Sequence, residues 1–95
     1  MDTKDTKIVI FKNKKVRKTL HNGEWWFSVV DIVEALIDSS DSGAYWRKLK
    51  QRLSEEGSEV VTFCHGLKLR APDGKMRETD CADTEGIFRL IQSIP

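Results

Sequence analysis

The sequence is short of the features that define several large classes of proteins. Its two cysteines, Cys64 and Cys81, are too few for a disulfide scaffold, and a reducing compartment is the simplest setting for them. No apolar run approaches the roughly 20 residues that cross a bilayer. The first residues lack the apolar core of a signal peptide. We therefore expect a cytoplasmic protein with no membrane partner.

Signatures of catalysis and metal binding are also missing. There is no glycine-rich phosphate loop and no Gly-x-Ser-x-Gly elbow. A Cys–His nucleophile could be formed by Cys64 with His65 or His21, but adjacent residues on a strand point to opposite faces, so Cys64 and His65 do not easily pair, and we do not expect thiol catalysis. The cysteines and histidines lack the ligand spacing of a zinc site. The acidic set suits a helix N-terminus and a solvated strand better than magnesium: Glu78, Asp80, Asp83 and Glu85. We therefore expect a protein that is not an enzyme and that binds no cofactor and no metal.

What remains is one small, charged, globular domain. The 95 residues are 39% hydrophobic and 33% charged, which is too apolar for a disordered chain. The net charge of +1 conceals a segregation of charge. Residues 1–20 carry seven positive and two negative charges, whereas residues 21–40 carry four negative charges and no positive one. Such segregation is compatible with a basic binding face and also with ordinary surface clustering.

The first third of the chain predicts a three-stranded antiparallel meander over residues 7–11, 16–20 and 24–27. A turn is expected at 12–14, and Asn22-Gly23 favours a type I′ hairpin turn. Lys18 falls on the apolar side of its strand, which predicts a place near a sheet edge. Alternation puts Trp25 and Phe27 on one face and Trp26 on the other, mostly in packing roles.

The period then changes to that of helices. Ser28 and Asp31 predict a capping box that opens an apolar helix over 28–37, and residues 38–43 predict a turn. A second helix is expected over 43–55, with Gly57 just past its end. Residues 60–63 predict a strand, and 67–70 with 75–79 a hairpin closed by the turn 71–74. Asp83 predicts the cap of a last, apolar-striped helix. The fold class is therefore α+β, with a small antiparallel sheet packed on about three helices.

The helices at 28–37 and 43–55 form a helix-turn-helix-like pair, because the first is apolar and the second is amphipathic and basic. We interpret the second helix as the element that approaches duplex DNA, and the hairpin at 67–79 as a wing that holds phosphates. The basic residues near the first turn, including Lys12 and Lys18, extend this surface. The predicted DNA-binding residues are Arg47, Lys48, Lys50, Arg52, Lys68, Arg70, Lys75, Arg77, Lys14, Lys15 and Arg17.

The order of these motifs resembles a known family. The segment NGEWWFSVVDIVEALIDSSDSGAYWRKLKQRL is similar to the BRO-N domain, found at the N-terminus of baculovirus BRO proteins and of phage and prophage antirepressor-like proteins. The segment LKLRAPDGKMRETDCADTEGIFRLIQSIP also resembles the prophage branch. The matching residues are Gly23, Trp26 and Phe27, then Asp31, Ile32 and Leu36, then Tyr45, Trp46, Arg47 and Lys48. Relatives often have proline at the start of the second helix, where this chain has Ser42-Gly43, so we expect Ser42 to cap that helix.

The resemblance implies a DNA-binding module, usually fused to a variable C-terminal domain. Because an apolar stripe precedes the last residue, we expect this single domain to be the N-terminal fragment of a longer protein. The last helix also makes a homodimer conceivable. The alternative function is a protein-interaction module that grips a phage repressor without DNA contact. In that case aromatic residues such as Trp26 and Tyr45 would be the anchors.

Overall fold

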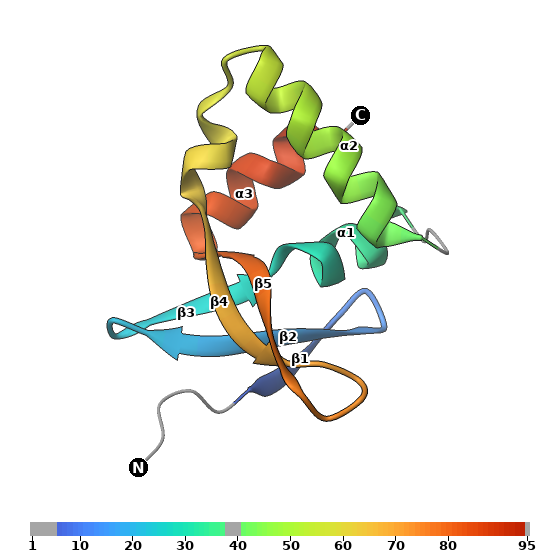
Figure 1. Cartoon of the computed structure of the whole chain (residues 1–95), viewed down its shortest axis with the longest axis vertical. Coiled ribbons are helices and arrows are strands. Elements are labelled where there is room, and N and C mark those ends of the chain that lie inside the picture. Colours follow the sequence, from blue (N-terminus) through green and yellow to red (C-terminus); the bar gives the residue numbers. More distant parts are fainter. Residues whose placement is uncertain (1–5, 38–40, 95) are drawn as a thin grey trace.

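The computed structural model describes residues 6–37 and 41–94. Its sheet has five antiparallel strands in the order β1-β2-β3-β5-β4. The helices gather at one end of the sheet (Figure 1). The elements in chain order are β1 (Lys7–Phe11), β2 (Lys14–His21), β3 (Glu24–Ser28), α1 (Val29–Ile37), α2 (Ser42–Glu55), the 3-10 helix η1 (Glu59–Phe63), β4 (Cys64–Arg70), β5 (Met76–Ala82) and α3 (Thr84–Ser93). The predicted α+β class is confirmed.

Two-residue turns build the meander of β1, β2 and β3. Asn22 and Gly23 both have positive φ, at 53° and 77°, as the predicted type I′ turn requires. The first turn uses the same geometry, with φ of 53° at Lys12 and 65° at Asn13. It is therefore one residue shorter than the predicted turn, and Lys14 already belongs to β2. Both turns have the twist that matches the flanking strands.

The β4–β5 hairpin joins the meander through only two residue pairs, Phe27 with Ala82 and Ser28 with Cys81. Beyond these pairs, β4 and β5 run across β2 and β3 (Figure 1). A small core of Trp26, Leu69 and Cys81 lies where they cross, with Leu67 packed against it. The sheet is therefore folded over on itself rather than open.

The larger core lies between the sheet and the helices. Its buried members come from all three helices and from β5: Val29, Val33, Trp46, Leu49, Leu53, Ala82 and Leu90. The six members that come from the helices belong to the apolar faces that the sequence predicts. None of the helices in the described part of the chain is both long and apolar enough to cross a membrane.

Side-chain caps fix where the helices begin. The Asp83 carboxylate accepts a hydrogen bond from the Gly86 N–H at 2.9 Å, which confirms the predicted cap of α3. The prediction for α2 was wrong by one residue: Asp41, not Ser42, is the cap and accepts from the Ala44 N–H at 3.0 Å. An N-terminal carboxylate also complements the helix dipole. Residues 38–40 of the predicted turn lie outside the described residues.

Two further predictions, the strand at 60–63 and the complete capping box, were wrong. The expected strand at 60–63 is η1, capped by Ser58, and the hairpin that follows is longer than expected. Lys18 lies on β2, which is next to the edge strand β1, as predicted, and its ammonium lies 4.0 Å from the centre of the Trp25 ring. Only half of the expected capping box forms. The Ser28 hydroxyl accepts from the Asp31 N–H at 3.3 Å, but the Asp31 carboxylate binds Arg17 instead.

Candidate nucleic-acid interface

The outward face of α2 carries two cations that are not used to hold the fold together. The opposite face of the helix packs into the core through Trp46, Leu49 and Leu53. Arg47 and Lys48 are exposed, and within residues 6–37 and 41–94 neither has an ion-pair or hydrogen-bond partner. Both side chains are therefore available to an anionic ligand.

The other two predicted cations of α2 have partners in the fold. The Lys50 ammonium lies 2.8 Å from the Asp80 carboxylate, which also accepts from the Trp46 indole N–H at 2.8 Å. Burial would raise the pKa of Asp80, but the hydrogen bonds from Lys50 and Trp46 outweigh it and lower this pKa. Lys50 therefore ties α2 to β5. Arg52 makes only a loose, exposed pair with Glu56 at 3.9 Å.

The basic residues of the β4–β5 hairpin also fall into two groups, those with a partner in the described part of the fold and those without one. Lys68 and Lys75 are exposed and have no ion pair among the residues that the structure describes. Arg77 pairs with Asp73, and this hydrogen bond lowers the pKa of Asp73. One guanidinium nitrogen of Arg70 donates to the Gly74 carbonyl at 3.1 Å, which leaves its other N–H groups available.

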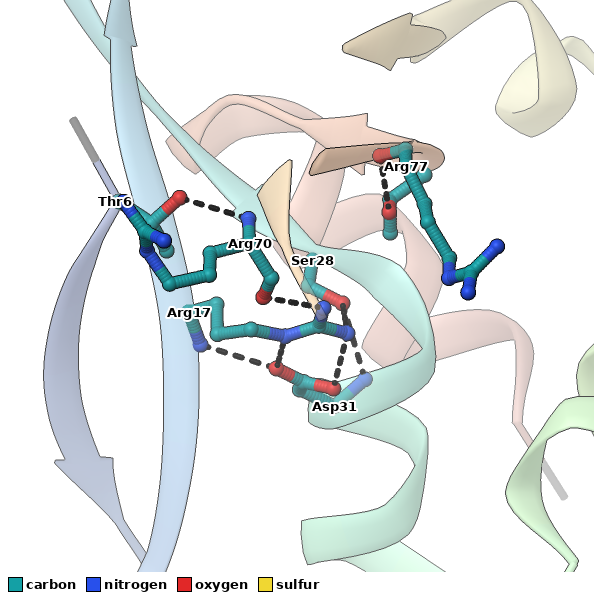
Figure 2. A network of polar contacts seen from close by, with 7 residues as sticks. Thr6, Arg17, Ser28, Asp31, Arg70 and Arg77 are labelled. Atoms are coloured by element: carbon teal, nitrogen blue, oxygen red, sulfur yellow. Dashed lines mark hydrogen bonds and ion pairs between the residues drawn. The ribbon is translucent and has the colours of Figure 1, made fainter. Parts of the chain in front are cut away.

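Arg17 is the predicted binding residue that is most engaged within the fold (Figure 2). Its guanidinium donates two hydrogen bonds to the Asp31 carboxylate, one from Nε at 2.8 Å and one from Nη2 at 3.0 Å. It also donates to the Ser28 hydroxyl at 3.3 Å and to the Arg70 carbonyl at 3.2 Å. The hydrogen bond with Asp31 raises the pKa of Arg17, although burial opposes this. Arg17 therefore joins β2, α1 and the end of β4.

The remaining basic residues lie around the first turn. Lys12 and Lys15 are exposed, whereas Lys14 and Lys18 are half-buried, and both of the latter make contacts within the protein. Figure 1 shows α2 at the upper part of the molecule and the loop between β4 and β5 at its lower end. The cations of α2 and those of the β4–β5 hairpin thus come from the upper and lower parts of the molecule.

The cysteines and histidines make no site. Burial raises the pKa of Cys64 to about 11 and that of Cys81 to about 12, so both are inert thiols at neutral pH. The His65 ring packs edge-on against Trp26, with ring centres 5.0 Å apart. No group of three or more metal-ligating side chains occurs among the residues described.

Sequence reasoning missed three residues that shape this surface. Asp31 was assigned to a cap and Asp80 to a solvated strand face, yet each holds a basic side chain. Thr6 was assigned no role, although its hydroxyl accepts from the Arg70 backbone N–H at 2.9 Å. One signal in the sequence could have indicated the Arg17–Asp31 pair: Asp31 is an acidic residue in an otherwise apolar turn of a helix. The partners of Asp31, Asp80 and Thr6 come from distant segments of the chain, so the sequence does not identify them.

Fold and surface together define a small α+β domain that presents cations from a helix and from a hairpin. The family model described as the BRO family, N-terminal domain, matches residues 15–95. The chain therefore belongs to the BRO family, and the matched part is its N-terminal domain. No curated protein sequence matched the chain. No solved structure matched it either.

Proposed function

We propose that this chain is a non-enzymatic DNA-binding domain of a prophage antirepressor-like regulatory protein. Membership of the BRO family supports a DNA-binding regulatory domain in general. The observation that carries the proposal is the set of exposed cations left unpaired within the described fold, from α2 and from the hairpin. These cations are Arg47, Lys48, Lys68 and Lys75.

The partition of the basic residues supports phosphate contact. A fold uses an arginine or lysine for stability by giving it an acceptor, as with Arg17 and Lys50. A cation left in solvent keeps its full charge for a ligand, and phosphate oxygens are the commonest acceptors in protein–DNA interfaces. We therefore assign the DNA contacts to the unpaired residues and a structural role to Arg17 and Lys50.

The test is fluorescence anisotropy with a labelled duplex of random sequence, titrated between about 50 and 200 mM salt. We expect log affinity to fall linearly with log salt. Arg47→Gln and Lys48→Gln are each expected to reduce the slope by about one, because each removes one phosphate contact.

The matched control is Arg89→Gln, which removes an exposed arginine from α3 that forms an ion pair with Glu85 at 3.3 Å. It is expected to leave the slope within error of the wild type. An equal loss in Arg47→Gln and Arg89→Gln would show that only total charge matters and would refute the assignment to α2. No binding at the lowest salt would refute the DNA-binding function.

A second function, binding of a repressor protein, is favoured by one observation. Phe88 and Ile10 are 62% and 61% exposed beside an apolar groove of about 240 Å3 lined also by Phe27 and Ile91. Trp26, which was expected to be an anchor, is buried, so Phe88 takes its place in the test. Loss of repressor binding in Phe88→Ser, with Arg47→Gln unaffected, would support this function over DNA binding.

A further inference from the structure

A pocket of about 530 Å3 opens between the β1–β2 hairpin and the end of β4. Its polar lining comes from Thr6, Lys15, Arg17 and Arg70, and Ile8 and Pro72 form apolar parts of its wall. The β1–β2 hairpin and the end of β4, which are more than 50 residues apart in sequence, therefore meet here. The pocket is separate from the exposed face of α2.

The pocket has a net positive charge, because its one lining carboxylate, that of Asp31, is neutralised by Arg17. Asp31 also lines it, but its two carboxylate oxygens are taken up by Arg17: Oδ2 accepts from the backbone N–H at 2.9 Å and from Nε at 2.8 Å, and Oδ1 accepts from Nη2 at 3.0 Å. Arg17 and Asp31 thus cancel in charge. The charges that remain are those of Lys15 and Arg70, both on exposed side chains.

Two donors of the pocket, Thr6 and Arg70, are held in place by the fold (Figure 2). The Thr6 hydroxyl accepts from the Arg70 N–H at 2.9 Å, so its own hydrogen remains free to donate. The Arg70 carbonyl accepts from Arg17 at 3.2 Å, and the Arg70 guanidinium is steadied by the Gly74 carbonyl at 3.1 Å. A ligand therefore meets two donors whose positions are already set.

Two cations and a hydroxyl donor, with no carboxylate left unpaired, suit a phosphate group. The exposed Ile8 side chain and the Pro72 ring offer an apolar surface beside it, and a deoxyribose fits such a surface. We propose that this pocket binds a phosphodiester of the DNA backbone through Lys15, Arg70 and Thr6. Arg17 is a positioning residue that holds the Arg70 backbone. The proposal rests on the DNA-binding function and adds a second contact surface to it.

The experiment uses the full 95-residue chain and the same labelled duplex. Lys15→Gln and Arg70→Gln are each expected to weaken binding several-fold and to reduce the salt slope by about one. Thr6→Val is expected to weaken binding with the slope unchanged, because it removes a neutral donor. This difference separates a hydrogen bond from a charge effect.

Lys7→Gln is the matched control for Lys15. Lys7 is exposed on β1 beside Ile8, and strand alternation turns it to the other face, outside the pocket. Arg89→Gln is the control for Arg70. Thermal melting of every variant confirms that it is folded.

The outcomes separate the two proposals. If Arg47→Gln weakens binding while Lys15→Gln and Arg70→Gln match their controls, the pocket is refuted and DNA binding stands. If the wild type binds no duplex, DNA binding is refuted, and inorganic phosphate is then titrated while the amide signals of Thr6, Ile8 and Ala71 are followed by NMR. Saturable shifts that disappear in Arg70→Gln would support a phosphate pocket, and their absence would overturn it.

Discussion

Replacing Arg17 with methionine tests whether the ion pair between Arg17 and Asp31 stabilises the fold. The substitution keeps the apolar stem and removes four side-chain hydrogen bonds, two to Asp31, one to Ser28 and one to Arg70. It leaves the Asp31 carboxylate, only 13% exposed, with the backbone N–H of residue 17 as its remaining donor from β2.

The expected loss is large. Breaking a fully buried ion pair costs about 3–5 kcal/mol, because the remaining charge stays desolvated. Both side chains of this pair retain some exposure, at 19% and 13%. We therefore expect Arg17→Met to lower the free energy of unfolding by about 3 kcal/mol. Asp31→Asn removes the charge but retains the shape, so its effect is expected to be smaller.

The assay is urea unfolding followed by tryptophan fluorescence, since Trp26 and Trp46 lie in the two cores. Arg52→Met is the matched control, because Arg52 and Glu56 are 49% and 60% exposed and 3.9 Å apart. It is expected to cost less than about 0.5 kcal/mol. A double-mutant cycle over positions 17 and 31 isolates the coupling. The reasoning fails if Arg17→Met costs no more than Arg52→Met.

Three further outcomes follow from the packing and the pKa shifts. Gly86→Ala is expected to destabilise by about 1–2 kcal/mol in urea, despite better helix propensity, because the new Cβ would lie 2.9 Å from that of Ala82; a gain would contradict this packing. The folded pKa of Asp80 lies below its unfolded value of 3.8, so Asp80 contributes stability above that pH that is lost as pH falls through the folded value. The difference in stability between wild type and Asp80→Asn is expected to shrink as the pH falls from about 4 through the folded pKa of Asp80, and parallel curves would be inconsistent with this. Cys81 is expected to react with a thiol reagent at about pH 8 only after unfolding, and rapid reaction of the native protein would refute its burial.

Local chemistry is what the sequence predicts best. The Asn22-Gly23 turn and the Asp83 cap were correct because a few neighbouring residues determine each of them. The apolar stripes of the helices also identified most of the larger core. Each of these features needs only the chain within one or two turns of a helix, or within one hairpin.

The errors arose where a distant segment competes with a local preference. Asp31 matches a capping pattern, but its carboxylate accepts hydrogen bonds from Arg17, 14 positions earlier, and not from the backbone N–H at the start of its own helix. Residues 60–63 have strand propensity, but Ser58 caps a 3-10 helix there, and Val60 and Val61 pack against the core that the helices form.

The candidate site was predicted by composition but not by geometry. The sequence identifies which residues are basic, and it gives no sign that Arg17 and Lys50 are neutralised within the fold. Nor does it place Thr6, Lys15 and Arg70 around one pocket, because these residues come from three separate segments. Pairing between remote charges is decided by the tertiary arrangement alone.

The two-pair junction between β3 and β5 also bears on how the domain folds. The meander and the β4–β5 hairpin are each closed by short connections, so each is built from contacts between near neighbours in sequence. The junction instead pairs Ser28 with Cys81, and it closes a loop of about 50 residues that holds α1 and α2. We therefore expect the docking of two locally formed halves, rather than the formation of either hairpin, to limit the rate of folding.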